Sequence, residues 1–122
     1  MALEYIRLFE DSEGESHFGT SSSDLAASEC APPAPPLEVS EVVDARHGFL
    51  RAAPGWFGDW HPSPARQFIC LLSGTLEVSA SDGETRRLTP GTVVLLEDTE
   101  GRGHATRVVS EEPAIMVFAQ LE

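Results

Sequence analysis

The chain is poor in several kinds of residue, and each shortage excludes a class of protein. It contains no lysine, and its eight basic residues are all arginine, against twenty acidic residues. The resulting formal net charge of −12 repels phosphate backbones and anionic lipid surfaces. The composition therefore predicts a protein that binds neither nucleic acid nor a membrane surface.

Long hydrophobic runs are missing as well. No apolar stretch approaches the roughly 20 residues of a membrane-spanning helix. The first residues, MALEYIRLFEDSEGE, have neither a basic leader nor an apolar core segment, so we expect no signal peptide and a cytoplasmic location. In that compartment Cys30 and Cys70, which do not form a CxxC pair, are expected to be free thiols.

The chain does contain many short apolar segments separated by turns. Its 122 residues suffice for one domain. LEYIRLF, at residues 3–9, predicts a first strand, and the Ser-, acid- and Pro-rich residues 10–36 predict an irregular segment. Strands are predicted at residues 37–45, 47–53, 67–72, 75–81, 84–89, 92–98, 103–110 and 114–121. The turn SDGE predicts a hairpin, and no helical spacing follows Ala45, so the fold is expected to be an all-β sandwich or barrel.

Two segments carry the residues that could take part in catalysis or metal binding. In the first, Gly55 is followed after five residues by His61, then by Ser63 and Gln67, and six residues after Gln67 comes Gly74. In the second, the turn Pro90-Gly91 leads into the apolar run VVLLE, the glycine-rich turn DTEGRG and then His104.

These two segments resemble the two motifs of the cupin superfamily, over residues 46–121. The opening YIRLFEDSEGESHF, the stretch APPAPPL, and the segments GDWHPSPARQF and TEGRGH also resemble those of small single-domain bacterial cupins. The resemblance implies a cupin jelly-roll barrel of residues 37–122, with an irregular N-terminal arm, residues 1–36, packed over it.

The resemblance also implies a metal site held by His61, Gln67 and His104. The ion would be a divalent one: Fe, Mn, Ni, Co or Zn. The family's second histidine position holds Ser63, and Gln67 stands where the family has a glutamate. Two imidazoles and a neutral amide carry no charge to offset that of the metal. Glu97 stands in place of the family's proline.

Strand geometry supports a shared pocket independently of the family. Because side chains alternate across a sheet, Gln67 and Leu71 share one face and Phe68 and Cys70 the other. A buried Gln67 amide needs a partner, because leaving it unpaired costs about 1–3 kcal/mol. A metal, a ligand or another side chain could supply that partner.

Each histidine also has a structural alternative. His61 could cap a strand at the barrel mouth, and His104 could be exposed to solvent. His17 could reach the mouth as a third imidazole, although a surface position is the simpler expectation. Asp98 and Glu100 could orient His104, or the charged turn could be solvated.

Three functions remain open, and we favour an enzyme. The first is a metal-dependent enzyme acting on a small organic molecule. The second is a metal-free isomerase, cyclase or dehydratase in which His61 or His104 is the general acid or base. The third is a non-catalytic module that binds a small metabolite. The first strand is long enough to pair with a sheet edge of a second subunit, so we also expect a homodimer.

Overall fold

The computed structural model describes residues 2–121, and within that range it contains strands and no helix, hence no helix that could cross a membrane. The elements are β1 (Ala2–Glu10), β2 (Ser16–Asp24), β3 (Ala26–Ser28), β4 (Leu37–Val39), β5 (Arg46–Ala52), β6 (Phe57–His61), β7 (Gln67–Ser73), β8 (Leu76–Ala80), β9 (Thr85–Leu88), β10 (Val93–Leu96), β11 (His104–Val108) and β12 (Ala114–Gln120).

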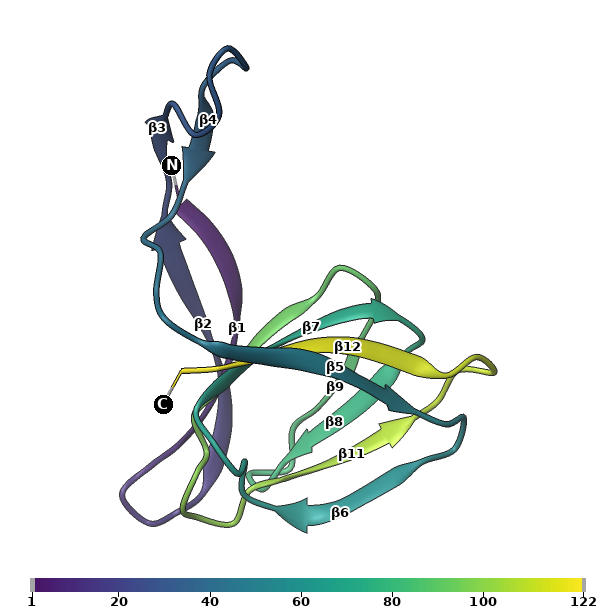
Figure 1. The fold of residues 1–122 in the computed structure, drawn as a ribbon. Helices are drawn as coiled ribbons and strands as arrows, with labels where there is room; N and C mark the ends of the chain where they lie inside the picture. The colour runs from purple at the N-terminus through teal and green to yellow at the C-terminus, as the bar shows by residue number, and fades with distance from the viewer. Residues whose placement is uncertain (1, 122) are drawn as a thin grey trace.

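Two sheets face each other and form the body of the molecule (Figure 1). The larger has the order β2-β1-β10-β7-β12-β5, and the smaller has the order β6-β11-β8-β9. Within the described chain, hydrogen bonds do not join the two sheets into one closed barrel. The two facing sheets, with no helix among residues 2–121, confirm the all-β jelly-roll fold expected from the sequence.

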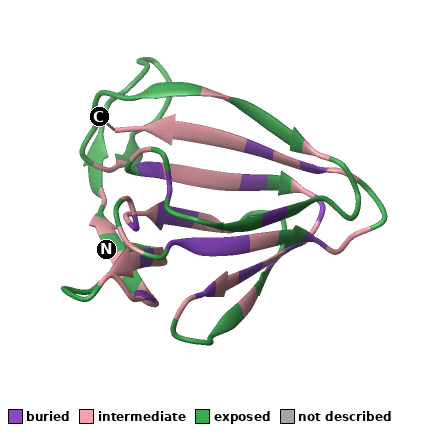
Figure 2. Ribbon diagram, turned by 90° about the horizontal axis from the view of Figure 1, so that it is seen from below, coloured by how far each residue is buried: buried purple, intermediate pink, exposed green. Residues whose placement is uncertain are grey.

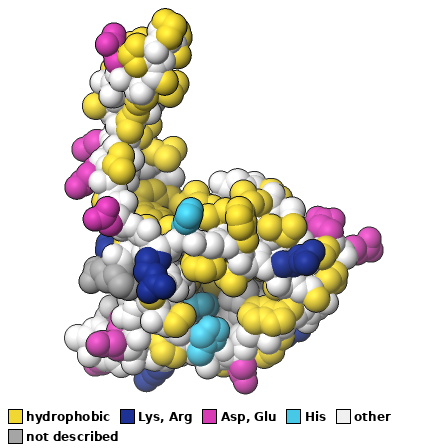
Figure 3. Space-filling model, viewed as in Figure 1, with side chains coloured by type: hydrophobic (Ala, Val, Ile, Leu, Met, Phe, Trp, Pro, Cys, Tyr) yellow, Lys and Arg dark blue, Asp and Glu magenta, His cyan; other side chains and the backbone are white. Residues whose placement is uncertain are grey.

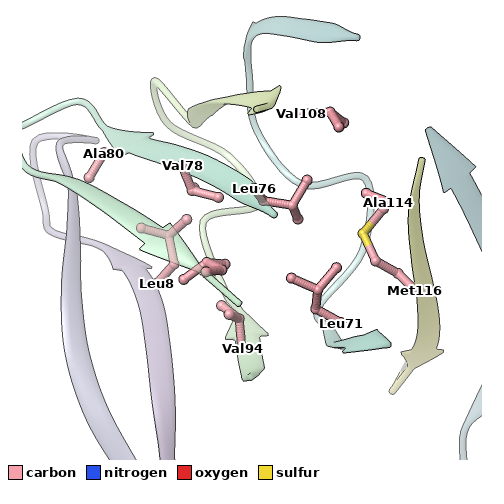
Figure 4. Packing of buried hydrophobic residues seen from close by; sticks show 10 residues of the cluster. Leu8, Leu71, Leu76, Val78, Ala80, Val94, Val108, Ala114 and Met116 are labelled. Carbon is pink, nitrogen blue, oxygen red and sulfur yellow. The ribbon is translucent and has the colours of Figure 1, made fainter. Parts of the chain in front are cut away.

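The hydrophobic core lies between the two sheets. Figure 4 shows Leu71, Val94 and Met116 of the larger sheet pointing toward Leu76 and Val78 of the smaller one. In Figure 2 buried residues occur along the strands among intermediate ones. In β8 the two classes alternate residue by residue, because every second side chain points inward. Aliphatic side chains dominate this layer, as the low aromatic content predicts.

The alternation predicted for β7 is confirmed. Gln67 and Leu71 are buried on the inner face. Phe68 lies on the outer face, where its ring contacts that of Tyr5 edge-on at 5.4 Å between centroids.

Three strands lie where the sequence did not predict them: β2, β6 and the three-residue β3, which pairs with β4. β2 occupies part of the segment expected to be irregular, because its backbone pairs with β1 in continuous register from Ala2↔Asp24 to Glu10↔Ser16. β6 lies in a glycine- and tryptophan-rich stretch and pairs with β11. In each case a neighbouring strand supplies the backbone hydrogen bonds, which outweigh the low strand propensity of the Ala, Gly and Asp residues in these strands.

Gly74 turns the chain between β7 and β8. Its φ is +78°, and a Cβ at this position would lie 2.7 Å from the Cα of Ala114. Gly91 also has a positive φ, +94°, but a Cβ there would meet no atom within 4 Å. The two glycines therefore share a backbone conformation and differ in the space available.

We predict that Gly74→Ala destabilises the fold more than Gly91→Ala. Both substitutions place an alanine in a left-handed conformation, which costs roughly 1–2 kcal/mol. In Gly74→Ala the added Cβ also clashes with the Ala114 backbone, and overpacking of this kind lowers the free energy of unfolding by about 1–3 kcal/mol more. Urea denaturation measures both, and equal losses for the two variants would contradict the assigned packing of this turn.

His17 joins the start of β2 to the β8–β9 hairpin. Its Nε2 lies 2.8 Å from Asp11 Oδ2 and its Nδ1 lies 2.9 Å from Asp82 Oδ2. These hydrogen bonds, first that to Asp11 and then that to Asp82, raise the pKa of His17 above its ordinary 6.5. The hydrogen bond with His17 also lowers the pKa of Asp11 below its ordinary 3.8. The pKa of Asp82 is lowered below 3.8 by a hydrogen bond from the Glu84 amide and, to a smaller extent, by the one with His17.

We predict that the stabilisation from His17 depends on pH. The folded state raises the pKa of this imidazole, so its contribution is complete below pH 6.5 and disappears as the pH rises through the raised value. At the acid end it disappears as the two carboxylates are protonated below 3.8. The difference in unfolding free energy between the wild type and His17→Asn should thus be largest between these limits.

Urea titrations across the pH range measure this difference, with His47→Asn as the control for loss of an exposed histidine. A difference that grows above neutral pH would contradict the assigned ion pairs.

Candidate functional site

His61 and His104 face each other across the two strands β6 and β11. They are direct partners in the strand register, and their ring centroids are 5.2 Å apart. The close approach depends on Gly103, whose φ is +76°: a Cβ there would lie 2.0 Å from the His61 carbonyl oxygen. Only glycine lets the start of β11 lie against the end of β6 and bring the two imidazoles together.

A buried carboxylate holds His104 in place. Asp98 is 0% exposed, and its Oδ2 accepts a hydrogen bond of 2.6 Å from His104 Nδ1. The other oxygen, Oδ1, is buried and has no hydrogen-bond partner within residues 2–121. The turn before His104 is therefore not wholly solvated: Asp98 orients the histidine, whereas Glu100 is exposed.

His61 has a fixed ring orientation too. Its Nδ1 donates to the backbone carbonyl of Asp59 at 2.7 Å. A carbonyl oxygen can only accept, so Nδ1 carries the proton. In the neutral forms of His61 and His104, Nε2 then keeps its lone pair, and two nitrogen acceptors are available at one place.

Gln67 reaches the same place from the opposite sheet. Its side-chain nitrogen donates to Ser63 Oγ at 3.2 Å, and Ser63 Oγ donates to the Ala65 carbonyl at 2.7 Å. The Ser63 amide in turn donates to the Asp98 carbonyl at 2.8 Å. The β6–β7 loop is thereby connected to the segment that positions His104, and the buried Gln67 amide finds its partner in a side chain.

One cavity of about 250 Å³ brings these groups together. His61, Ser63, Gln67 and His104 line it, so the structure unites the three residues predicted from the sequence. The remaining walls are almost entirely apolar: Phe18, Leu50, Trp56, Pro64, Ile69, Leu76, Val78, Leu88, Val94, Leu96, Met116 and the polar Thr106. Figure 3 shows histidine side chains among hydrophobic ones where this face is hollowed.

The sequence analysis did not identify the apolar wall, of which Trp56, Phe18 and Leu50 are examples. Trp56 lies in a turn and packs over Gly58, where a Cβ would approach its ring to 2.5 Å. Phe18 comes from the segment expected to be irregular, and Leu50 from the sheet edge. A tryptophan two residues before Gly58 could have indicated a ring packed over that glycine. The positions of Phe18 and Leu50 depend on the tertiary fold.

The other two histidines and Glu97 lie outside the cavity. His17 has both ring nitrogens bound to carboxylates, and His47 is exposed on β5. Glu97 binds Arg7 and Arg66 on the outer side. Partial burial raises the pKa of Glu97, but the two guanidiniums together outweigh it and hold the pKa below the ordinary 4.5.

The donor set does not fit a resident divalent metal centre. Catalytic metal sites take about three protein ligands, commonly with a carboxylate or thiolate among them. No group of three His, Cys, Asp or Glu side chains within the described chain is placed to hold an ion. Gln67 offers a neutral amide whose nitrogen is bound to Ser63. No carboxylate lines the cavity, since Asp98 lies behind His104 on its Nδ1 side.

Comparisons with known proteins agree with this fold. The model of the cupin domain family matches residues 48–119. Comparison with curated proteins yields no match.

Solved structures resemble the chain at low sequence identity. The cupin domain of an XRE family transcriptional regulator from Enterobacter cloacae is 25% identical, with a TM-score of 0.51 over 78% of this chain and 93% of that one. A cupin domain from Bordetella pertussis Tohama I is 17% identical, with a TM-score of 0.51 over 82% and 95%. A conserved protein of unknown function from Streptococcus pyogenes is 21% identical, with a TM-score of 0.50 over 69% of each chain.

These neighbours fit a β jelly roll, which is the arrangement of the two sheets described above. The family match covers more than half of the chain and includes every strand that positions the two histidines. The chain therefore belongs to the cupin domain family.

Proposed function

We propose that the protein is a metal-free cupin enzyme that transfers a proton on a small, largely apolar organic molecule. The observation that carries this proposal is the Asp98–His104 pair at the polar end of an apolar cavity. An isomerase, cyclase or dehydratase reaction would each use such a proton transfer.

The cavity supports a substrate with two unlike ends. Its apolar walls suit a hydrocarbon or aromatic body, and its small volume limits that body to a small molecule. The polar groups His61, Ser63, Gln67 and His104 gather where a hydroxyl, carbonyl or carboxyl head of the substrate would be oriented. The strongly apolar surroundings lower the local dielectric and strengthen these hydrogen bonds.

His104 is assigned the acid–base role and Asp98 the role of positioning it. Asp98 accepts a hydrogen bond from the Nδ1–H of His104 and so keeps Nε2 available to take a proton from the substrate. The imidazolium that forms is stabilised by the carboxylate behind it. The Nε2 of His61 lies near the same substrate atoms and can accept a hydrogen bond from the substrate, while His104 returns the proton that it took.

Binding without catalysis is the second candidate. It is favoured by the likeness to the cupin domain of the Enterobacter cloacae regulator, which is part of a transcriptional regulator. The same cavity would then hold a metabolite and the buried Asp98 would serve only to satisfy His104. Substitution of Asp98 separates the two functions.

We predict that Asp98→Asn slows proton exchange without abolishing binding. An asparagine oxygen still accepts the His104 Nδ1 hydrogen bond, but it no longer offers a negative charge to the imidazolium. The rate should fall about 10²–10⁴-fold, the usual contribution of general acid–base catalysis. NMR in D₂O, following deuterium incorporation into a panel of small ketones and carboxylic acids, measures the rate, and chemical-shift titration measures binding.

Unchanged exchange in Asp98→Asn, or no protein-dependent exchange with any compound that binds, would contradict the enzymatic proposal and favour the binding module.

We predict that His61→Ala abolishes binding of such compounds while changing stability by no more than about 0.5 kcal/mol, as for most exposed side chains. The His61 side chain is exposed at the cavity mouth, so its loss uncovers little buried surface. His47→Ala is the matched control, because His47 is exposed and lies outside the cavity. A variant that melts early yet binds normally would show that His61 merely caps its strand.

We also predict that protein purified without chelator or added metal carries far less than one equivalent of divalent ion. The reason is the absence of an anionic ligand and of a third imidazole from the donor set described above. Elemental analysis tests this. About one equivalent of Fe, Mn, Ni, Co or Zn, lost in His61→Ala, would instead support the metal site of His61, Gln67 and His104.

A further inference from the structure

The polar end of the cavity presents hydrogen-bond acceptors to whatever occupies it. His61 donates its Nδ1 proton to the Asp59 carbonyl, and His104 donates its Nδ1 proton to a carboxylate. In both neutral rings the remaining nitrogen, Nε2, therefore carries a lone pair and no proton. The two rings are 5.2 Å apart between centroids and both line the cavity, so a ligand head placed there meets two neighbouring acceptors.

Gln67 adds a third acceptor, because the Ser63 hydroxyl determines which end of the amide faces it. That hydroxyl gives its single proton to the Ala65 carbonyl, so Ser63 Oγ can only accept from Gln67. The Gln67 nitrogen is thus turned to Ser63, and Oε1 has no hydrogen-bond partner among the described residues. Oε1 is not sealed from open space, since within the described chain only a carboxylate oxygen is both buried and unpaired. The open space that the Gln67 side chain lines is the cavity.

The cavity offers no cation to balance an anionic head. The chain has no lysine, and among the described residues none of its eight arginines lines the cavity. A carboxylate, Asp98, lies directly behind His104. The donors are neutral and few: the Thr106 hydroxyl, which rotates, and the second amide proton of Gln67. A carboxylate head would thus meet lone pairs and a negative charge, whereas a hydroxyl head finds its acceptors in place.

We propose that the substrate is a neutral 2-hydroxy ketone with an apolar body. This proposal rests on the proton transfer proposed above and narrows the substrate head to a hydroxyl beside a carbonyl. The hydroxyl donates to His61 Nε2 or Gln67 Oε1, and the carbonyl oxygen accepts from the Thr106 hydroxyl. The carbonyl also makes the neighbouring C–H bond acidic, which gives His104 a proton to take. The apolar walls and the volume of about 250 Å³ suit a short hydrocarbon body.

Proton transfer on such a compound gives its isomer. His104 Nε2 takes the proton from the carbon that bears the hydroxyl, and the electron pair of that C–H bond moves to the carbonyl oxygen. His104 then returns the proton to this oxygen, which produces a neutral enediol. In the second half, His104 takes the proton of the original hydroxyl and delivers it to the former carbonyl carbon. R–CO–CH(OH)–R′ becomes R–CH(OH)–CO–R′, with no oxidant, reductant or water consumed.

The acceptors match the enediol better than they match the substrate. The 2-hydroxy ketone has one O–H donor, whereas the enediol has two adjacent ones. His61 Nε2 and Gln67 Oε1 take these two donors, while His104 Nε2 carries out the proton transfers. A hydrogen bond that forms only as the reaction proceeds lowers the barrier rather than merely tightening substrate binding.

A stable analogue of the enediol tests the acceptor set. Catechol has two adjacent hydroxyls on a planar frame, phenol has one, and benzoate carries an anionic head on the same ring. NMR titration of the full-length chain at pH 7.5, without oxygen, measures the three affinities. Catechol should bind about five- to tenfold more tightly than phenol, as one more hydrogen bond contributes, and benzoate most weakly. Phenol is smaller and less polar, so a hydrophobic preference alone would reverse the first order. Equal affinities, or tightest binding of benzoate, would overturn the proposal.

Gln67→Met removes one acceptor at nearly constant volume. The preference for catechol over phenol should then fall to about twofold or less. Gln120→Met is the matched control, because Gln120 lies opposite Gln67 in the strand register but does not line the cavity. It should keep the full preference, and circular dichroism checks that both variants fold. A preference that survives in Gln67→Met, or is lost equally in both variants, contradicts the role of Gln67 Oε1.

Turnover separates this substrate from the proton transfer on which it rests. In D₂O the protein should convert 3-hydroxyhexan-2-one into 2-hydroxyhexan-3-one and place deuterium on carbon. Relative to the rates without protein, hexan-2-one, which lacks the hydroxyl, should exchange about tenfold more slowly. Equal acceleration of the two ketones overturns the hydroxyl requirement and leaves the proton transfer standing. Exchange with neither ketone, although catechol binds in the expected order, overturns both and favours the binding module.

Discussion

The buried contact between Asp98 and His104 is the constraint on which the rest of the site depends. A carboxylate with no exposure to water is tolerated because it accepts a short hydrogen bond from an imidazole nitrogen. Removing His104 leaves the carboxylate buried and unpaired, which commonly costs about 3–5 kcal/mol. Removing Asp98 leaves a buried imidazole N–H without its acceptor, which costs about 1–3 kcal/mol. The same contact determines which nitrogen of His104 remains for a ligand, so a structural requirement and a chemical one coincide in a single pair.

The two sheets contribute unequal parts to the cavity. The smaller sheet supplies His61 and His104 as cross-strand neighbours, and the larger sheet supplies Gln67. The floor is shared with the hydrophobic core, since Val78 and Met116 belong to both. A ligand seated there would replace water at an apolar surface while its polar end meets oriented nitrogen acceptors. An apolar floor beside two oriented nitrogen acceptors favours proton transfer on an apolar substrate over the binding of a charged ion.

Much of the fold was predictable because alternation and turn residues are local signals. The SDGE hairpin and the inward position of Gln67 follow from patterns a few residues long, and the structure has both. β2 was not predictable in this way, because its serine-rich sequence becomes a strand only beside β1. Among the site residues, Asp98 and Glu100 were both candidates to orient His104, and the sequence did not distinguish them, because the burial of Asp98 against His104 is a consequence of the tertiary fold.

The tautomer of His104 tests the central claim most directly. Long-range ¹H–¹⁵N NMR of the histidine side chains reports which ring nitrogen carries a proton. Our account predicts a proton on His104 Nδ1, in a short hydrogen bond with a strongly downfield resonance that is lost in Asp98→Ala, and a response of Nε2 to compounds bound in the cavity. A bare Nδ1 on His104 with the proton on Nε2, or a spectrum unchanged by Asp98→Ala, would contradict it.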